Sequence, residues 1–174
     1  MIRFVHIAGL SSLVAAISPA ALADVDMPNR KPGLWEIQIV GSQMGSPTIQ
    51  QCTDETTDKE MRTSFGPVGK NMCDKQDIQK TATGFTIDAT CNIAGTASTS
   101  HTEISGDFNS AYTIKVSSNR PGGPAGASSE HTMVMNATWK GSCAAGQKAG
   151  DIIMPGGIKM NIKDMQKLRA MMPQ

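Results

Sequence analysis

Residues 85–91, FTIDATC, alternate strictly between apolar and polar side chains. One face carries Phe85, Ile87, Ala89 and Cys91, and the opposite face carries Thr86, Asp88 and Thr90. Successive side chains of a β-strand point to opposite sides, so this period of two predicts a strand with one buried and one solvated face. The pattern recurs on both sides of this stretch and decides the fold class.

Strand patterns extend over most of the chain. They occupy residues 33–40, 48–52, a stretch from Gln76 to a turn at Thr83-Gly84, 85–91, 96–105, 108–117, 131–139, 151–154 and 158–162. The last two flank Pro155-Gly156-Gly157, residue types that favour a tight hairpin. Strands that follow one another in sequence usually pair, so we expect about six to eight antiparallel strands in sequence order. The predicted fold is mainly β, a single meander curled into a barrel or half-barrel.

Two segments differ from this pattern. Residues 96–105, TASTSHTEIS, are polar on both faces and predict an edge strand or a heavily solvated strand. Residues 119–128, NRPGGPAGAS, are rich in Gly and Pro and predict a long flexible loop. Either segment is a candidate contact surface for a protein partner in the cell envelope.

Two helices are expected. Residues 53–64, TDETTDKEMRTS, place acids near the start and Thr57 and Glu60 at capping-box spacing, which predicts a short helix after the second strand. We interpret the charged side chains of this helix as a solvated face. At the C-terminus, Asn161 is a candidate cap for a helix with Ile162, Met165, Leu168 and Met172 along one side.

The first 23 residues have the composition of a secretory signal peptide. Arg3 gives a basic start, an apolar stretch follows, and the triplet Ala21-Leu22-Ala23 suits cleavage after Ala23. No later stretch is long enough to span a membrane, and no cysteine follows the cleavage site to accept a lipid. The predicted organisation is a cleaved leader at 1–23, an N-terminal segment at 24–32, one β domain at 33–162 and a tail or short helix at 163–174.

Charge argues against a nucleic-acid partner. The chain has 174 residues, with 16 Lys+Arg and 15 Asp+Glu. Removal of the leader, which carries one Arg and no acid, leaves 174 − 23 = 151 residues with 15 basic and 15 acidic side chains. A formally neutral domain lacks the excess positive charge that binds phosphates.

Aromatic residues make up only 4% of the chain, so we expect methionine and disulfides to compensate for a small supply of large core residues.

The four cysteines are expected to pair in an oxidising compartment. Cys52, Cys73, Cys91 and Cys143 allow three pairings. Cys73 with Cys91 and Cys52 with Cys143 is the favoured set, because the first pair flanks one predicted hairpin and the second would tie early chain to late chain. A metal–thiolate site is disfavoured, since no C-x-x-C pair is present.

Two sets of residues are candidates for ligand binding. His131, Met133 and Met135 share one face of a predicted strand, and imidazole and thioethers are ligands that suit Cu(I). The competing interpretation is that these methionines fill gaps in the core. The other set is expected to face inward, as core residues or as the lining of a small hydrophobic ligand site. Its members are Trp35, Phe85, Tyr112 and Trp139.

No catalytic residues are predicted. The chain has no G-x-S-x-G elbow, H-E-x-x-H helix or P-loop. Paired cysteines would leave no thiolate nucleophile. No cofactor is expected, and a hydrolase without a recognisable motif is the least favoured function.

The order of motifs resembles a known family. RKPGLWEIQIV follows the leader at 30–40, QQCTDE precedes the short helix at 50–55, and TWKGSCAAGQKAGDIIMPGG lies at 138–157. Over roughly residues 30–160 the chain is similar to the bacterial exported family catalogued as domain of unknown function 3617. The resemblance implies a periplasmic protein of Gram-negative bacteria, supports disulfide bonding and carries no activity. We therefore expect a non-catalytic envelope binding or structural domain, with Cu(I)/Ag(I) binding or carriage of a small hydrophobic ligand as alternatives.

Overall fold

The computed structural model describes residues 25, 27–41, 45–65, 73–93, 96–119 and 130–171. The expected leader at 1–23 and nearly all of the loop predicted at 119–128 lie outside the described residues. The described elements are β1 (Gly33–Val40), β2 (Thr48–Thr53), α1 (Glu55–Phe65), β3 (Cys73–Lys80), β4 (Gly84–Ile93), β5 (Thr96–Asp107), β6 (Ala111–Asn119), β7 (Glu130–Gly141), β8 (Asp151–Ile153), β9 (Lys159–Asn161) and α2 (Ile162–Met171). The mainly β prediction and both predicted helices are confirmed.

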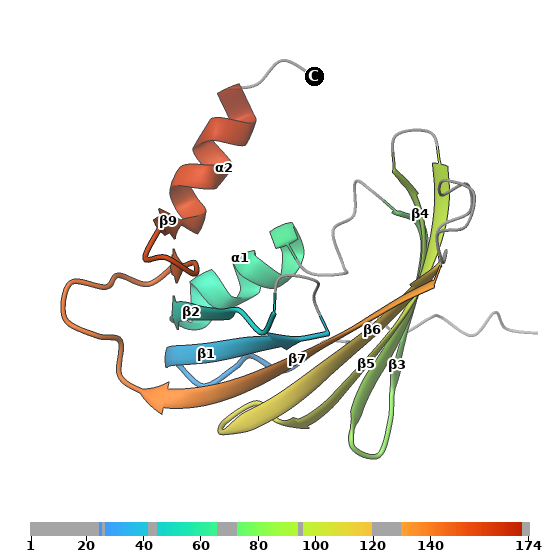
Figure 1. Ribbon diagram of the computed structural model, residues 1–174, viewed down its shortest axis with the longest axis horizontal. Coiled ribbons are helices and arrows are strands. Elements are labelled where there is room, and N and C mark those ends of the chain that lie inside the picture. The colour runs from blue at the N-terminus through green and yellow to red at the C-terminus, as the bar shows by residue number, and fades with distance from the viewer. Residues whose placement is uncertain are drawn as a thin grey trace, which may run out of the picture.

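The described strands form one antiparallel sheet in the order β3-β4-β5-β6-β7-β1-β2-β8-β9. Figure 1 shows this sheet as a strongly curved layer, an open half-barrel with α1 on its concave side beside β1 and β2. The sheet has nine strands where six to eight were expected, and the meander follows sequence order only from β3 to β7. After β7 the first strand is inserted, because β1 pairs along its length with β7 and Trp35 lies opposite Trp139.

Of the two alternatives predicted for residues 96–105, an edge strand or a heavily solvated strand, the edge position is wrong. β5 lies between β4 and β6 and is hydrogen-bonded on both sides, whereas β3 and β9 form the edges. Its polar start is partly or fully exposed on both faces, but Thr102 and Ile104 further along are buried. A backbone ladder pairs peptide groups whatever the side chains, so a polar composition indicates solvation and not an edge.

The core lies on the concave side of the sheet. Its buried members are Trp35, Phe85, Ile87, Ile104, Tyr112 and Ala137. The Tyr112 ring stacks on Phe108 at a centroid distance of 5.0 Å and lies 5.4 Å from the Trp35 ring. Phe108 was predicted within a strand but lies in the turn between β5 and β6, from which its ring still reaches this cluster.

Gly33 allows β1 to approach β7 closely. Its φ of 133° lies in a region that other residues rarely adopt. A Cβ atom built there would lie 2.3 Å from the Gly141 oxygen and 2.7 Å from Nε1 of Trp139. The register of β1 and β7 shifts next to it, between Leu34 and Trp35. The glycine of the PGLW motif is therefore needed where these two strands meet.

The start of α1 differs from the predicted capping box. Asp54 Oδ1 accepts a hydrogen bond of 2.8 Å from the Thr57 backbone N–H, and Thr57 Oγ1 accepts one of 3.0 Å from the Asp54 N–H. The box thus pairs Asp54 with Thr57, three residues before the predicted pair of Thr57 and Glu60. The difference arises because β2 continues to Thr53 and the helix begins at once after it. At α2 the predicted cap is present, since Asn161 Oδ1 accepts from the Lys163 N–H at 3.0 Å.

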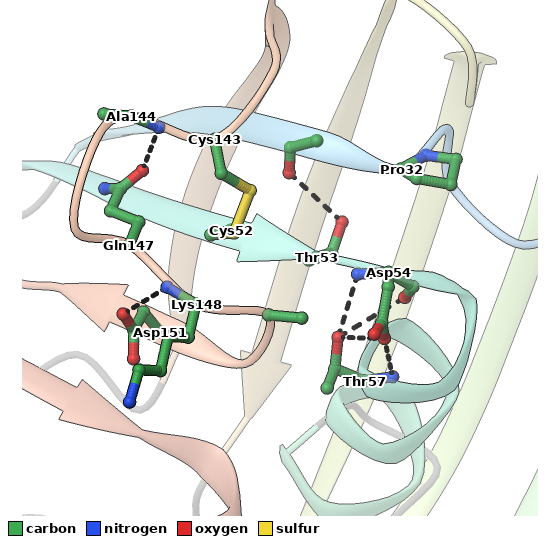
Figure 2. Close-up of a disulfide and its surroundings, with 12 residues drawn as sticks. Pro32, Cys52, Thr53, Asp54, Thr57, Cys143, Ala144, Gln147, Lys148 and Asp151 are labelled. Atoms are coloured by element: carbon green, nitrogen blue, oxygen red, sulfur yellow. Dashed lines mark hydrogen bonds between the residues drawn. A yellow bond between two sulfur atoms is a disulfide. The ribbon is translucent and has the colours of Figure 1, made fainter.

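All four cysteines are paired, as Cys52–Cys143 and Cys73–Cys91. This is the pairing favoured from the sequence. The second bond joins residues that lie opposite each other on β3 and β4 and so fastens an edge strand. Figure 2 shows the first bond linking the end of β2 to the segment that follows β7, close to the Asp54–Thr57 cap of α1.

Candidate functional site

A cavity of about 240 Å³ lies between the concave face of the sheet and α1. Most of its wall is apolar, and the polar residues are Arg30, Gln51 and Arg62, with the hydroxyl of Tyr112. The apolar wall consists of Met27, Ile37, Met61, Ile104, Phe108, Ile114, Met135, Ala137 and Ile152, with the ring of Tyr112. A largely apolar hollow with a few polar groups has the composition of a small-molecule site.

Strand register builds the apolar wall. Ile104 lies opposite Ile114, and Ile114 lies opposite Met135, so three adjacent strands present these side chains in one row. In the next row Tyr112 lies opposite Ala137, which lies opposite Ile37. The period-two alternation therefore directs apolar side chains from β1, β5, β6 and β7 into the same space.

Residues 27–31, MPNRK, form a segment that we call the N-terminal strap. The Lys31 N–H donates to the Phe108 carbonyl oxygen at 2.8 Å, which fixes the strap to the β5–β6 turn. Arg62 of α1 donates from its guanidinium to the carbonyl oxygens of Met27 and Pro28 and to the side-chain oxygen of Asn29. The strap therefore bridges α1 and the sheet, and Met27 and Arg30 line the cavity from it.

Arg30 is the most constrained charge in this wall. Its side chain is 7% exposed, and Nε lies 2.5 Å from Oδ1 of Asp58, whose side chain is fully buried. The Arg30 backbone N–H also donates to Oδ2 of Asp58 at 3.0 Å. The guanidinium Nη1 donates to Gln51 Oε1 at 3.0 Å and to the Tyr112 hydroxyl oxygen at 3.3 Å. One buried arginine thereby connects the strap, α1, β2 and β6.

The protonation states of these groups follow from their surroundings. Burial by itself lowers the pKa of Arg30, but the Tyr112 oxygen and the Asp58 carboxylate more than offset it and leave the pKa raised. Burial raises the pKa of Tyr112, and the positive charge of Arg30 opposes this only in part. The site therefore contains a charged guanidinium beside a protonated phenol.

Arg30 and Asp58 were not predicted from the sequence as residues of this site. The charges of α1 were interpreted as a solvated face, whereas Thr57 and Asp58 are fully buried and Met61 is 6% exposed. A signal was present in the sequence, since Asp58 and Met61 lie three residues apart and share a helix face with Arg62. The partner of Asp58, however, is 28 residues away in sequence, and no local pattern identifies it.

The aromatic residues and the His–Met residues predicted for ligand binding lie in different surroundings. Tyr112 and Met135 line the cavity, Trp35 and Phe85 are buried in the adjoining core, and Trp139 is half-buried with the Lys31 ammonium 3.6 Å from its ring centroid. His131 is exposed and Met133 is 36% exposed, so neither lines the cavity with Met135. Within the described ranges, no group of three or more His, Cys, Asp or Glu residues is placed to hold a metal ion.

A separate polar cluster lies on the exposed face of β4 and β5. His101 Nδ1 lies 2.7 Å from Asp88 Oδ1, and His101 Nε2 lies 3.6 Å from Glu103 Oε1. The hydrogen bond to Asp88 raises the pKa of His101 above its ordinary value. All three side chains are about half exposed, so the cluster is a solvated network on the outside of the half-barrel.

The region of the chain that matches a known family contains most of this site. The model of a family described as "Protein of unknown function (DUF3617)" matches residues 30–143. No curated protein and no solved structure matches the chain. The match begins at Arg30 and ends at Cys143, so it contains both disulfides and most of the cavity wall. No helix among the described elements is long and apolar enough to cross a membrane.

Proposed function

The chain belongs to the DUF3617 family of proteins of unknown function, and we propose that it is an exported, non-catalytic domain of the bacterial envelope that binds a small hydrophobic ligand. The observation that carries this proposal is the apolar cavity between the half-barrel and α1. Residues from the strap, α1 and six strands meet there, so the site exists only in the folded chain.

Export is supported by two independent features of the chain. Its first 23 residues have the composition of a signal peptide, and all four cysteines are paired. We propose cleavage after Ala23, which leaves Asp24 at the N-terminus of one β domain followed by a C-terminal helix. Expression of the full chain in a Gram-negative host, followed by periplasmic fractionation and intact-mass measurement, tests this. We expect an oxidised species of 151 residues, whereas a full-length cytoplasmic product with free thiols would contradict export.

Ligand binding is tested with a neutral fluorescent probe. We expect N-phenyl-1-naphthylamine to gain emission on binding to the mature protein, because its rings leave water for an apolar cavity. The substitution Met135→Trp enlarges a side chain that lines the cavity and should abolish the gain. The matched control Thr138→Trp places the same side chain on the exposed face of β7 and should leave it unchanged. Equal emission from wild type and both variants would place the probe elsewhere.

Copper(I) or silver(I) binding is the second candidate. It is favoured by three cavity-lining thioethers, Met27, Met61 and Met135, since thioethers suit soft cations. Arg30 and Arg62 line the same cavity, however, and their positive charges oppose entry of a cation. Titration with Ag(I) distinguishes the two functions, because tight binding that is lost in Met135→Leu would support the metal site instead.

A further inference from the structure

The polar part of the cavity wall carries an excess of positive charge. Arg30 and Arg62 both line it, and the carboxylate of Asp58 is shared between them. Asp58 lies 2.5 Å from Arg30 Nε, and its other oxygen lies 3.6 Å from Arg62 Nε. Among the described residues, Asp58 is the carboxylate that pairs with both guanidinium groups. The side chain of Arg62 is 22% exposed, and its remaining hydrogen bonds are to neutral oxygens of the strap. This part of the wall therefore has one more positive than negative charge and favours an anionic ligand.

The same wall has more hydrogen-bond donors than acceptors. The Tyr112 oxygen accepts from Arg30, but its own hydrogen has no acceptor in the part of the chain that the structure describes. Nε of Arg62 is buried and has no hydrogen-bond partner there. Among the described residues, Nη2 of Arg30 donates to the thioether of Met61, at 3.8 Å, and sulfur is a weak acceptor. The Tyr112 hydroxyl and Nη2 of Arg30 can therefore donate to an acceptor from outside the chain.

The tyrosine donor is buried and well placed. Tyr112 is 8% exposed, lines the cavity and remains protonated because burial raises its pKa. A buried hydroxyl hydrogen without an acceptor costs free energy, which a ligand oxygen would recover. The row of side chains next to Tyr112 on the sheet, formed by Ile104, Ile114 and Met135, offers only apolar surface. The cavity wall therefore combines polar donors with an apolar surface.

We propose that the ligand is an alkyl carboxylate, with its carboxylate against Arg30, Arg62 and Tyr112 and its chain along the apolar strands. The inference rests on the proposed function and specifies its ligand class. A carboxylate supplies the missing charge and accepts several hydrogen bonds, and arginine matches its geometry. The volume of about 240 Å³ suits one short chain and is below the range of drug-sized sites.

Three ligands with the same chain and different heads test the head-group preference. Decanoate, decanol and decylammonium are titrated at neutral pH into the mature, oxidised protein, with displacement of N-phenyl-1-naphthylamine as the readout. We expect decanoate to bind at least about tenfold more tightly than decanol, because charge-assisted hydrogen bonds replace neutral ones, and decylammonium to bind most weakly. Equal affinities of decanoate and decanol would overturn the carboxylate inference and retain the hydrophobic site. Failure of all three ligands and the probe would instead overturn the proposed function.

Two substitutions locate the head group. Tyr112→Phe removes the unfilled donor and keeps the ring that packs on Phe108, and Arg62→Gln removes the excess positive charge. Each should weaken decanoate binding about tenfold more than decanol binding, so that the preference for decanoate over decanol falls. Lys115→Gln is the matched control, because its ammonium lies on the exposed face of β6 beside Glu103. Retention of the full decanoate preference in Tyr112→Phe and Arg62→Gln, with native circular dichroism, would overturn the placement.

Discussion

Asp58 forms the ion pairs that hold Arg30 of the strap and Arg62 of α1. Its side chain is fully buried, and it accepts from the backbone and the side chain of Arg30. Its carboxylate also lies 3.6 Å from Arg62. Removal of one partner from a buried ion pair leaves the other charge unpaired, which costs far more than the loss of an exposed pair.

We therefore expect Asp58→Asn to lower the free energy of unfolding by about 3–5 kcal/mol, measured by urea denaturation at pH 7. The matched control is Asp164→Asn in the first turn of α2. Asp164 is 72% exposed and lies 3.6 Å from Lys167, so its loss should cost less than about 1 kcal/mol. Similar effects of the two substitutions would show that the buried ion pair has no special role.

Trp35 is the largest fully buried side chain among the described residues. We expect Trp35→Ala to destabilise the protein by about 3–5 kcal/mol, because it leaves a cavity between β1 and the Tyr112 ring. Trp139→Ala on the neighbouring strand should cost less, since Trp139 is only half-buried. Unfolding midpoints in urea compare the two, and an unchanged midpoint for Trp35→Ala would contradict the inward position of this side chain.

His101 gives a pH prediction at the residue scale. Its pKa is raised by the hydrogen bond to Asp88, so the stabilisation from this pair is complete below the unfolded pKa of about 6.5 and is lost as pH rises through the folded pKa. An NMR titration should show the His101 pKa above 6.5 in wild type and lowered in Asp88→Asn. Asp107→Asn, which alters an acid at the end of β5, should leave the His101 titration unchanged.

At the scale of elements, the cap of α1 is the most directly testable local structure. The backbone hydrogen bond from Thr57 is the main cause that lowers the pKa of Asp54. A depressed pKa means that the cap stabilises the protein above about pH 3.9 and that this contribution is lost as pH falls through the folded pKa. Asp54→Ala should therefore cost about 1 kcal/mol at pH 7.

The control for the cap is Asp54→Asn, which keeps an oxygen that accepts from the Thr57 N–H. It should retain most of the stability at pH 7 and remove the acid dependence due to Asp54. Urea unfolding at pH 7 and pH 3 measures both effects. If Asp54→Ala and Asp54→Asn proved equally destabilising, the capping hydrogen bond would not be the source of the stability.

Elements could be predicted from sequence to different degrees. The bounds of β1 agree with the predicted 33–40, because Gly33 at its start and strict alternation through Val40 are local signals. β5 was predicted as an edge strand or a heavily solvated strand because its side chains are polar, and the edge position is wrong because β4 and β6 both pair with it. Pairing depends on backbone groups and on the position of neighbouring strands, and neither is encoded in the polarity of the strand itself.

At the scale of the whole molecule, the two disulfides close loops of very different length. Cys52 and Cys143 are 91 residues apart and join β2 to the segment after β7, whereas Cys73 and Cys91 are 18 residues apart within one hairpin. In the chain-entropy model these bonds are worth about 4.5 and about 3 kcal/mol. Loss of the Cys52–Cys143 bond, which closes the longer loop, should therefore lower the free energy of unfolding more than loss of the Cys73–Cys91 bond.

The expected outcome is a lower urea midpoint for the double variant Cys52→Ala with Cys143→Ala than for Cys73→Ala with Cys91→Ala. Single-bond variants purified in the oxidised form, with the remaining bond verified by mass spectrometry, give the comparison. The opposite order would mean that fastening the edge strand β3 matters more than closing the long loop.

Within the described structure, sequence by itself determined the strands, the helix after β2 and the favoured cysteine pairing, because alternation, turn residues and hairpin spacing are local properties. Tertiary structure alone decided that β1 joins β7 and that β5 is internal. It also decided that Arg30 pairs with Asp58, 28 residues away, and lines a cavity together with Tyr112. The physical reason is that a period of two specifies which face of a strand is buried but not which strand lies beside it. Only the folded half-barrel places two guanidinium groups, paired with one buried carboxylate, and a tyrosine hydroxyl in the wall of one apolar cavity.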